Sequence, residues 1–445
     1  MKIDQNKLAR QKIGVEKWIE NNYKGTFEYV TGVGKTYAAI LCMKEVLNAN
    51  PRATFIVAVP RDPLRTMWRE ELKYHNIPNA RVDTIHMLAK QELSCDMLIL
   101  DELHMYVGDE AEVFPLIFEN TTFSKCLGLT ATLGRDGIRR DLVDMYCPVV
   151  DVIDTKEALE GGYVSDYVIF NLGIPLTQED SIAYSKINNQ FYRYFGVFDN
   201  NFDSVKACLT PDGAKRHVRA KRIAWDHGVI INYAVRCMKY MRLRKEFLYG
   251  VESKLRVAKE IIERFPDKKI ITFSQTTDPA DKLAELVDCC ESYHSNLTTR
   301  LYDKDMNHVG SKLEGNKYHV FKTDEVLSWK EIKAKYNYVR FGTKRLRSYI
   351  LDRFISGDIR VLSTAQALDV GHDDKYIDGG IIMSGTSKMR QNIQRSGRVI
   401  RTRPGKRAFI VQLYIMDTQD EKWLKDRQKN TGDVKNIYSI SQIEV

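Results

Sequence analysis

The sequence predicts an α/β protein that contains two parallel β-sheets and, between them, a mainly helical accessory segment. Short aliphatic or β-branched runs alternate with helical patterns in the first third of the chain, and the same alternation returns in the last third. Strands separated by helices of this length form βαβ units and hence a parallel sheet. The middle stretch has few strand signals and is rich in Tyr, Phe, Asn, Arg and Lys, so we expect it to be helical.

The length and composition agree with this architecture. The 445 residues are enough for roughly two to four domains. With 43% hydrophobic and 29% charged residues, the composition is that of a globular protein and excludes the fibrous and disordered classes. We expect a first domain at residues 1–160, a linker with a basic accessory segment at 161–250, and a second domain at 251–445 with an insertion near 301–343.

The expected elements follow one another in a strand and helix order. In the first domain, strands are expected at 27–30, 55–59, 97–100 and 127–130, with helices at 37–47 and 64–74. In the second domain, strands are expected at 269–273, 360–362, 380–383 and 408–414, with helices at 254–265 and 349–354. The stretch 301–343 is polar and charged and interrupts the second alternation, so we expect it to be irregular.

Positive charge is concentrated in the accessory segment. The chain carries 68 Lys and Arg against 59 Asp and Glu, and residues 206–245 alone contain eleven Lys or Arg and two acidic residues. This excess predicts a polyanionic partner such as nucleic acid. The alternative, that these charges only solvate the outer face of a helix, stays open at this point.

Cysteine usage and the apolar pattern predict where the protein acts. None of the eight cysteines forms a CxxC pair, and the adjacent Cys289 and Cys290 suit an ordinary disulfide poorly, which favours a reducing, intracellular setting. Residues 1–10 lack the apolar core of a signal peptide, and no run approaches the ~18 apolar residues of a membrane span. We expect a soluble cytoplasmic protein, or a nuclear one if the host has a nucleus, with no membrane partner. The narrower expectation, a bacterial or phage-infected host cell, is implied only by the motif resemblance below.

A phosphate-binding loop is expected directly after the first strand. Glycines let backbone N–H groups close on phosphate oxygens, the helix N-terminus adds its positive end, Lys35 supplies a cation and the Thr36 hydroxyl can bind Mg²⁺. Tyr29 stands where the generic loop pattern has its first glycine, which is a departure from that pattern. The loop consists of Thr31, Gly32, Val33, Gly34, Lys35 and Thr36.

Two acidic residues complete the candidate hydrolysis site. Asp101 and Glu102 follow the apolar run 97–100, so both emerge at the carboxyl end of a buried strand, where α/β sheets bind ligands. Phosphoryl transfer needs one carboxylate to hold Mg²⁺ and a second group to orient the attacking water. We assign Asp101 to the first role and Glu102 to the second. His104 is a candidate for passing on the nucleotide state. Taken alone, the acidic pair could be a helix cap, but the phosphate loop upstream favours the catalytic interpretation.

These motifs resemble those of the superfamily 2 helicases of the DEAD/DExH group, which have tandem RecA-like domains. Gln11, upstream of the loop, is similar to the adenine-reading glutamine of that family. The loop resembles motif I, Asp101 to His104 resemble motif II in its DExH form, and residues 129–132 resemble motif III, which links hydrolysis to strand movement. Residues 58–60 with Leu64 and Trp68 resemble motif Ia, which implies that they face the nucleic acid.

The resemblance continues in the second half of the chain. Residues 271–274 resemble motif IV, 293–295 a segment that often follows it, and 361–364 with Gly371 and Asp373 motif V. The stretch 394–401 is similar to the QRxGRxxR motif VI. The resemblance implies that Arg398 and Arg401 are arginine fingers and that Arg395 joins the domains. It also implies that Gly371, Asp373 and Gln394 contact the nucleotide.

Phosphoryl-transfer chemistry agrees with these implied roles. The transition state spreads negative charge over the γ-phosphate, and a guanidinium from a facing domain stabilises it. Because Arg398 and Arg401 lie far from Glu102 in the sequence, hydrolysis would require two domains to close on ATP and Mg²⁺.

The chain departs from the family near 301–343, where the expected short connection between His294 and Phe354 is replaced by a long one. Aromatic and basic residues of this insertion could stack on bases or wedge a duplex, and the alternative is a decorative insertion. These residues are Tyr318, His319, Phe321, Lys322, Trp329 and Lys330.

The resemblance implies an ATP hydrolase that moves along nucleic acid, with 3′ to 5′ polarity. The motif forms are more similar to DNA-directed members, and among these to phage recombination and branch-migration helicases, than to RNA-directed members. We therefore expect a DNA helicase or translocase that acts on single-stranded, forked or branched DNA in recombination, repair or replication, together with proteins of those processes. The alternatives are an RNA-directed helicase, the motor subunit of a restriction-type complex, and a non-catalytic scaffold.

Overall fold

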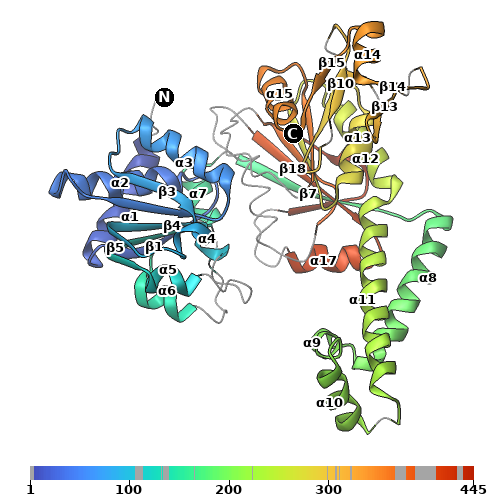
Figure 1. The fold of residues 1–445 in the computed structure, drawn as a ribbon, viewed down its shortest axis with the longest axis horizontal. Helices are drawn as coiled ribbons and strands as arrows, with labels where there is room; N and C mark the ends of the chain where they lie inside the picture. Colours follow the sequence, from blue (N-terminus) through green and yellow to red (C-terminus); the bar gives the residue numbers. More distant parts are fainter. Residues whose placement is uncertain are drawn as a thin grey trace.

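The computed structural model describes two parallel β-sheets flanked by helices, a projecting helical arm and a small β-rich insertion (Figure 1). The described residues are 5–105, 114–131, 133, 140–164, 166–222, 224–297, 299–305, 308–309, 311–320, 323–365, 377–385, 407–427 and 434–445.

The first sheet has six parallel strands in the order β3-β2-β4-β5-β1-β6. Its strands are β1 (Lys24–Tyr29), β2 (Phe55–Val59), β3 (Ala80–Thr84), β4 (Leu93–Asp101), β5 (Thr121–Thr130) and β6 (Val149–Ile153). The helices are α1 (Gln5–Glu20), α2 (Lys35–Ala49), α3 (Asp62–Tyr74), α4 (Ile85–Leu88), α5 (Phe114–Glu119), α6 (Arg140–Tyr146) and α7 (Thr155–Glu160). The expected strands and helices of this region are confirmed. Within the described residues, the structure adds two edge strands and five helices that were not expected, namely β3, β6, α1, α4, α5, α6 and α7.

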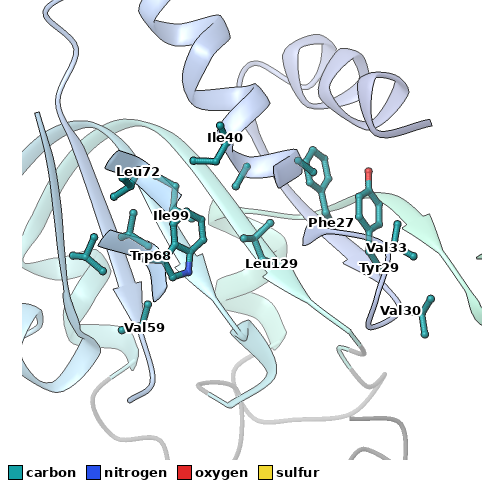
Figure 2. Packing of buried hydrophobic residues seen from close by; sticks show 14 of the residues in the cluster. Phe27, Tyr29, Val30, Val33, Ile40, Val59, Trp68, Leu72, Ile99 and Leu129 are labelled. Carbon is teal, nitrogen blue, oxygen red and sulfur yellow. The ribbon is translucent and has the colours of Figure 1, made fainter. Parts of the chain in front are cut away.

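Burial explains why these strands could be recognised in the sequence. Every residue of β2 and the last five residues of β4 are buried, because helices cover the sheet. Behind the phosphate loop, large side chains from β1, α2, α3 and β4 pack into one core, as Figure 2 shows for Phe27, Ile40, Trp68, Leu72 and Ile99. This core holds the loop and the acidic strand end on a rigid sheet.

The second sheet has seven parallel strands in the order β19-β7-β18-β17-β8-β16-β9. Its strands are β7 (Asp166–Ile174), β8 (Ile270–Ser274), β9 (Cys290–Tyr293), β16 (Val361–Ala365), β17 (Gly379–Ile382), β18 (Arg407–Ile415) and β19 (Val434–Ile437). The helices around it are α12 (Glu252–Arg264), α13 (Thr277–Leu286), α15 (Thr343–Ser356) and α17 (Gln419–Arg427). The second predicted α/β region is therefore confirmed.

Strand β7 belongs to the second sheet although it precedes the helical segment in the sequence. All nine of its residues pair with β18, and its other edge pairs with β19. This placement differs from the expected start of the second domain at residue 251, because the linker range 161–250 contributes a strand to that domain's sheet. The pairing partners lie far apart in the sequence, so no local pattern could reveal them.

The helical segment, residues 178–250, forms an arm that projects from the second sheet (Figure 1). It contains α8 (Gln178–Phe195), α9 (Phe202–Ala207), α10 (Pro211–Lys221) and α11 (His227–Gly250). The prediction of a mainly helical accessory segment is confirmed. Its core contains Phe191, Tyr194, Phe195, Phe198, Val205, Cys208, Ala214, Ile230, Ala234 and Cys237. Arg244 of α11 is buried, with its guanidinium 3.9 Å from the Phe191 ring centroid, and this burial lowers the pKa of Arg244.

Buried polar contacts attach the base of the arm to the second sheet. Lys254, just after α11, lies 2.6 Å from the Asp420 carboxylate of α17, and both side chains are fully buried. At the start of the arm, the Tyr184 hydroxyl accepts a hydrogen bond from the Gln419 backbone N–H at 3.0 Å. Both ends of the arm are therefore attached to α17, next to the second sheet.

The insertion is ordered, and the expectation of an irregular stretch was wrong. It contains two antiparallel three-stranded sheets and α14 (Trp329–Tyr336). The strands are β10 (Arg300–Tyr302), β11 (His308–Val309), β12 (Ser311–Glu314), β13 (Lys317–Val320), β14 (Glu325–Ser328) and β15 (Val339–Phe341). Its core consists of Leu301, Val309, Tyr318, Val320 and Ile332. Strands of two to four residues leave no long alternation in the sequence, which is why the pattern gave no strand signal.

The cysteines and the hydrophobicity of the helices can be compared with the sequence analysis. All eight cysteines are free thiols. Within the described parts of the chain, no helix is long and apolar enough to cross a membrane.

Candidate active site

Helix α1 is fixed to the first sheet by a buried carboxylate. The Asp151 side chain, on β6, is fully buried and accepts hydrogen bonds from Arg10 and the Tyr29 hydroxyl, each at 2.6 Å, and from Lys17 at 2.6 Å. Burial opposes the charge on Asp151, but the donors from Arg10, Lys17 and Tyr29 outweigh it and lower the pKa of Asp151. At Gly14, a Cβ atom would lie 2.0 Å from the Tyr29 hydroxyl oxygen, so only glycine lets the helix approach this closely.

This anchored helix supports the phosphate loop from behind. The amide nitrogen of Gln11 is buried and donates to the carbonyl oxygens of Val33 at 2.8 Å and Gly34 at 3.2 Å. Lys7, one turn earlier, donates from Nζ to the Gly32 carbonyl at 2.5 Å and to the Tyr163 carbonyl at 3.1 Å. The sequence analysis did not identify Lys7 as a site residue. The one feature that could have indicated it is its position four residues before Gln11, which places both side chains on one face of the helix.

The loop itself has the backbone that phosphate binding needs. Gly32 and Gly34 have φ angles of 100° and 91°, the left-handed region that favours glycine. Helix α2 begins at Lys35, and no side chain caps its first turn, so its N-terminal N–H groups point to the loop side without a side-chain acceptor. A cradle of backbone donors at a helix N-terminus suits an anionic phosphate.

The tyrosine at position 29 is explained by the geometry. Its side chain is fully buried between β1 and α1, and its carbonyl oxygen accepts a hydrogen bond from Lys35 Nζ at 3.3 Å. The residue therefore anchors the strand end and orients the lysine, while the turn itself is made by Gly32 and Gly34.

Asp101 and Glu102 lie at the carboxyl end of β4, as expected. Asp101 is 4% exposed, and Glu102 is half-buried with a φ of 52°. The left-handed backbone at Glu102 has the modest energetic cost that non-glycine residues have in this region, and the Glu102 carboxylate lies 3.4 Å from His104 Nδ1. The two carboxylates are thus separated into different environments, which two different roles require.

The electrostatics of Asp101 indicate a site that needs positive charge. Burial, and then the neighbouring charge of Glu102, raise the pKa of Asp101 from 3.8 to about 6, while the Trp68 N–H, Lys35 and the Glu102 backbone N–H oppose the shift. A cation would favour the charged carboxylate. Among the described residues, no group of three or more His, Cys, Asp or Glu could hold a metal ion. This donor set still fits Mg²⁺, which phosphoryl-transfer sites hold through one or two carboxylates, substrate phosphates and water.

His104 connects the acidic strand end with the neighbouring strand. It is buried, and its Nδ1 lies 3.1 Å from the Thr130 hydroxyl and 3.4 Å from Glu102 Oε2. Thr130 ends β5 and belongs to the stretch that resembles motif III. His104 therefore contacts both the second acidic residue and the last residue of β5.

Trp68 corrects one expectation. The resemblance to motif Ia implied that it faces nucleic acid, but its side chain is fully buried in the core of the first sheet. Its indole Nε1 donates to Asp101 Oδ2 at 2.8 Å. The amphipathic pattern of α3 directs this large ring inward, so it cannot stack on bases.

In the second sheet, the described motif residues lie at the carboxyl ends of neighbouring strands. The Gln275 backbone N–H, after β8, donates to the Ser384 hydroxyl at 2.8 Å, and the Thr364 hydroxyl, on β16, donates to the Thr272 carbonyl at 2.7 Å. His294 is buried and lies 3.0 Å from Asp281, so its described contacts are structural. Tyr318 of the insertion is buried in the insertion core, so the interpretation that it could stack on bases was also wrong.

Several predicted site residues lie outside the described residues. They are Gly371, Asp373, Gln394, Arg395, Arg398 and Arg401, together with Thr132, Phe321 and Lys322. The described site therefore comprises Gln11, Thr31, Gly32, Gly34, Lys35, Thr36, Asp101 and Glu102 on the first sheet.

Comparisons with known sequences agree with this site. A sequence model described as "Type III restriction enzyme, res subunit" matches residues 5–92, which include the loop. The chain is 22% identical over 436 residues to the DNA 3'-5' translocase XPB2 of Sulfurisphaera tokodaii, with 93% of this chain and 83% of that protein covered.

Comparisons with solved structures support the fold. The structure of S. cerevisiae Dbp5 bound to RNA and ADP BeF3 has a TM-score of 0.55 at 13% identity, covering 96% of this chain and 89% of that chain. The ATP-dependent Type ISP restriction-modification enzyme LlaBIII bound to DNA also has a TM-score of 0.55, at 12% identity, covering 98% of this chain and 31% of that one. The expected pair of tandem RecA-like domains is confirmed.

Proposed function

We propose, from the premise that this chain is a superfamily 2 helicase, that it is an ATP-dependent DNA helicase or translocase acting on forked or branched DNA. The observation that carries the proposal is the meeting of the phosphate loop and the acidic strand end at one edge of the first sheet, where Lys35 acts electrostatically on the buried Asp101. A loop for phosphates beside a buried carboxylate supports ATP hydrolysis.

Each described site residue has a role in this chemistry. The Lys35 ammonium and the backbone N–H groups of Gly32 and Gly34 would bind the phosphates, and Thr36 and Asp101 would hold Mg²⁺. The metal ion would neutralise charge on the β- and γ-phosphate oxygens. Glu102, which is less buried than Asp101, would orient the attacking water. Gln11 supports the loop and would read the adenine base, as the resemblance implies.

The second domain would complete the site. The resemblance assigns Arg398 and Arg401 to the transition state, with Gly371, Asp373 and Gln394 as nucleotide contacts, and these assignments remain proposals. Closure of the two domains on ATP and their reopening after hydrolysis would move the DNA. The contact of His104 with Glu102 and Thr130 supports a path by which the hydrolysis state reaches motif III.

The DNA preference is supported by the printed function of the relative, a DNA translocase, and by the charge of the arm. The exposed cations of α10 and α11 suit a phosphate backbone, and binding through them should depend strongly on salt. The finer assignment is supported by the motif forms alone. It is that the protein acts in recombination or branch migration, as phage helicases do, in the cytoplasm and together with replication or recombination proteins.

A second candidate function is the motor subunit of a restriction-type complex. The match of residues 5–92 to a restriction-enzyme family favours it, and a partner subunit would have to supply the nuclease. An RNA-directed helicase is the other alternative. Substrate preference distinguishes the three.

The test is the ATPase rate measured in parallel with single-stranded DNA, unbranched duplex, forked DNA, four-way junctions and RNA. We expect stimulation by DNA, strongest with branched forms, and strand separation or junction movement. Stimulation by RNA alone would support the RNA-directed alternative, and translocation on unbranched duplex without strand separation would support the restriction-type motor.

Two lysines of α2 provide a matched pair of variants for this assay. Lys35→Ala should lower the rate on the order of 100-fold, because a preorganised cation at the phosphates is lost. Lys44→Ala removes an exposed lysine from the same helix and should leave the rate within about twofold. Unchanged turnover in Lys35→Ala would contradict the proposed function and favour a non-catalytic scaffold.

A further inference from the structure

The contact between Trp68 and Asp101 has no role in the function described so far. Trp68 lies on α3, the helix that follows β2, and Figure 2 shows its ring among Val59, Leu72 and Ile99, with all four side chains labelled. The surroundings are apolar, and the side chain is fully buried. A buried indole N–H needs a hydrogen-bond acceptor, and here that acceptor is Asp101 Oδ2 at 2.8 Å.

The other oxygen of the carboxylate is also fixed. Asp101 Oδ1 accepts a hydrogen bond from the Glu102 backbone N–H at 3.0 Å. One donor comes from the acidic residue's own strand end and the other from a separate helix, so the two together define the plane of the carboxylate. Each carboxylate oxygen can accept more than one contact, so capacity remains for a metal ion or its water ligands.

We propose that Trp68 is a positioning residue that sets the orientation in which Asp101 binds the metal ion of the nucleotide site. The proposal rests on the proposed function, because it takes Asp101 as the metal-binding carboxylate. Groups that orient a ligand in this way commonly affect metal affinity by about 10- to 100-fold. A ring locked in a packed core gives a more fixed donor than a water molecule or a flexible side chain would.

The consequence for the first domain is a direct link between two segments. Helix α3 carries Leu64 and Trp68 of the stretch that resembles motif Ia, and one hydrogen bond joins this helix to the proposed metal-binding strand end. A displacement of α3 by about 1 Å along the bond would take this 2.8 Å contact out of hydrogen-bond range and release Asp101 Oδ2.

The test separates positioning from packing. Trp68→Phe removes the N–H but keeps an aromatic ring in the core, and Leu72→Ala, one turn later on the same helix, disturbs the same core without a contact to Asp101. The affinity for ADP is measured with and without Mg²⁺ for the wild type and both variants. The ratio of the two affinities isolates the contribution of the metal ion.

We expect Trp68→Phe to reduce this Mg²⁺-dependent ratio by about 10-fold or more, with little change in metal-free ADP binding. Leu72→Ala should leave the ratio unchanged even if the protein is less stable. Asp101→Asn should remove the effect of Mg²⁺, so that ADP binds equally well with and without the metal ion. Adding Trp68→Phe to Asp101→Asn should then change the ratio no further.

Three results decide the proposal. A ratio in Trp68→Phe within twofold of the wild type would overturn it while leaving the proposed function intact. Equal losses in Trp68→Phe and Leu72→Ala would also overturn it, because the effect would then come from packing. A wild-type protein that binds no ADP with Mg²⁺ would overturn the proposed function and this proposal together.

Discussion

The arm and the insertion both extend the second domain, but they are built and charged differently. The arm packs two long helices around an aromatic core, and its residues 206–245 carry eleven Lys or Arg against two acidic residues. The insertion, taken as residues 300–341, folds short strands around a five-residue core and carries nine Lys or Arg against six acidic residues. Ion pairs occur in both regions, for example Lys335 with Glu325 in the insertion and Lys221 with Asp199 in the arm, so the contrast lies in the larger excess of Lys and Arg in the arm.

This difference indicates that the arm is the better candidate for holding a polyanion. Cations that exceed the local acids keep their charge available for phosphates, whereas cations paired locally lose part of it. Exposed Trp225 stacks on Tyr233 at the N-terminal start of α11, with ring centroids 5.4 Å apart, which adds an aromatic surface near the basic helices. The predictions below test the contrast between the two regions.

The largest expected effect is a loss of local stability when one buried side chain in each core is truncated. Ile332→Ala in the insertion and Ile230→Ala in the arm both truncate fully buried side chains and should each cost about 2–5 kcal/mol of local stability. Hydrogen exchange of β13 and α11 amides measures the loss. Only Ile230→Ala should also weaken DNA binding; an equal loss of DNA binding in Ile332→Ala would remove the contrast.

The next effect concerns charge. Reversal of two exposed arm cations, Lys215→Glu with Arg219→Glu, should weaken DNA binding by about 10- to 100-fold at low salt and reduce the slope of log affinity against log salt by about two. The matched control reverses two exposed cations of α14, Lys330→Glu with Lys333→Glu. Fluorescence anisotropy with labelled forked DNA at several salt concentrations measures both; similar slopes in the two variants would contradict the assignment of the grip to the arm.

The smallest effect should come from the surface pairs of the insertion. Lys335 is about half exposed and pairs with Glu325, and ion pairs at the surface contribute little to stability because water and salt screen them. Lys335→Ala should therefore change the denaturation midpoint little and leave DNA binding within twofold. A large drop in DNA affinity would show that the insertion contributes a phosphate contact after all.

The same contrast shows how much of the structure the sequence could predict. The arm was predicted as helical because its composition and local pattern are helical over long stretches, as in residues 227–250. The insertion was not, because strands such as His308–Val309 depend on partners elsewhere in the chain. Strand β7 was missed for the same physical reason, since it pairs with β18 across the whole arm.

For the site, the contiguous motifs were predictable and the supporting contacts were not. Lys35, Asp101 and Glu102 lie within short motifs whose chemistry is local, and the structure brings their strand ends together. Lys7 and Trp68 act through tertiary contacts, so only the folded chain shows what they touch. Burial also decided against two aromatic residues: Trp68, which the resemblance to motif Ia placed towards nucleic acid, and Tyr318, whose residue type suggested stacking on bases.

The attachment of the arm has a mechanical consequence. The chain enters the arm from β7, which is paired along nine residues with β18, and leaves it into α12, where the buried Lys254 and Asp420 meet. A force on the tip of the arm would therefore act on the backbone hydrogen bonds between β7 and β18 and not on a flexible linker. With this attachment, a rotation of the second sheet would carry the tip of the arm along with it.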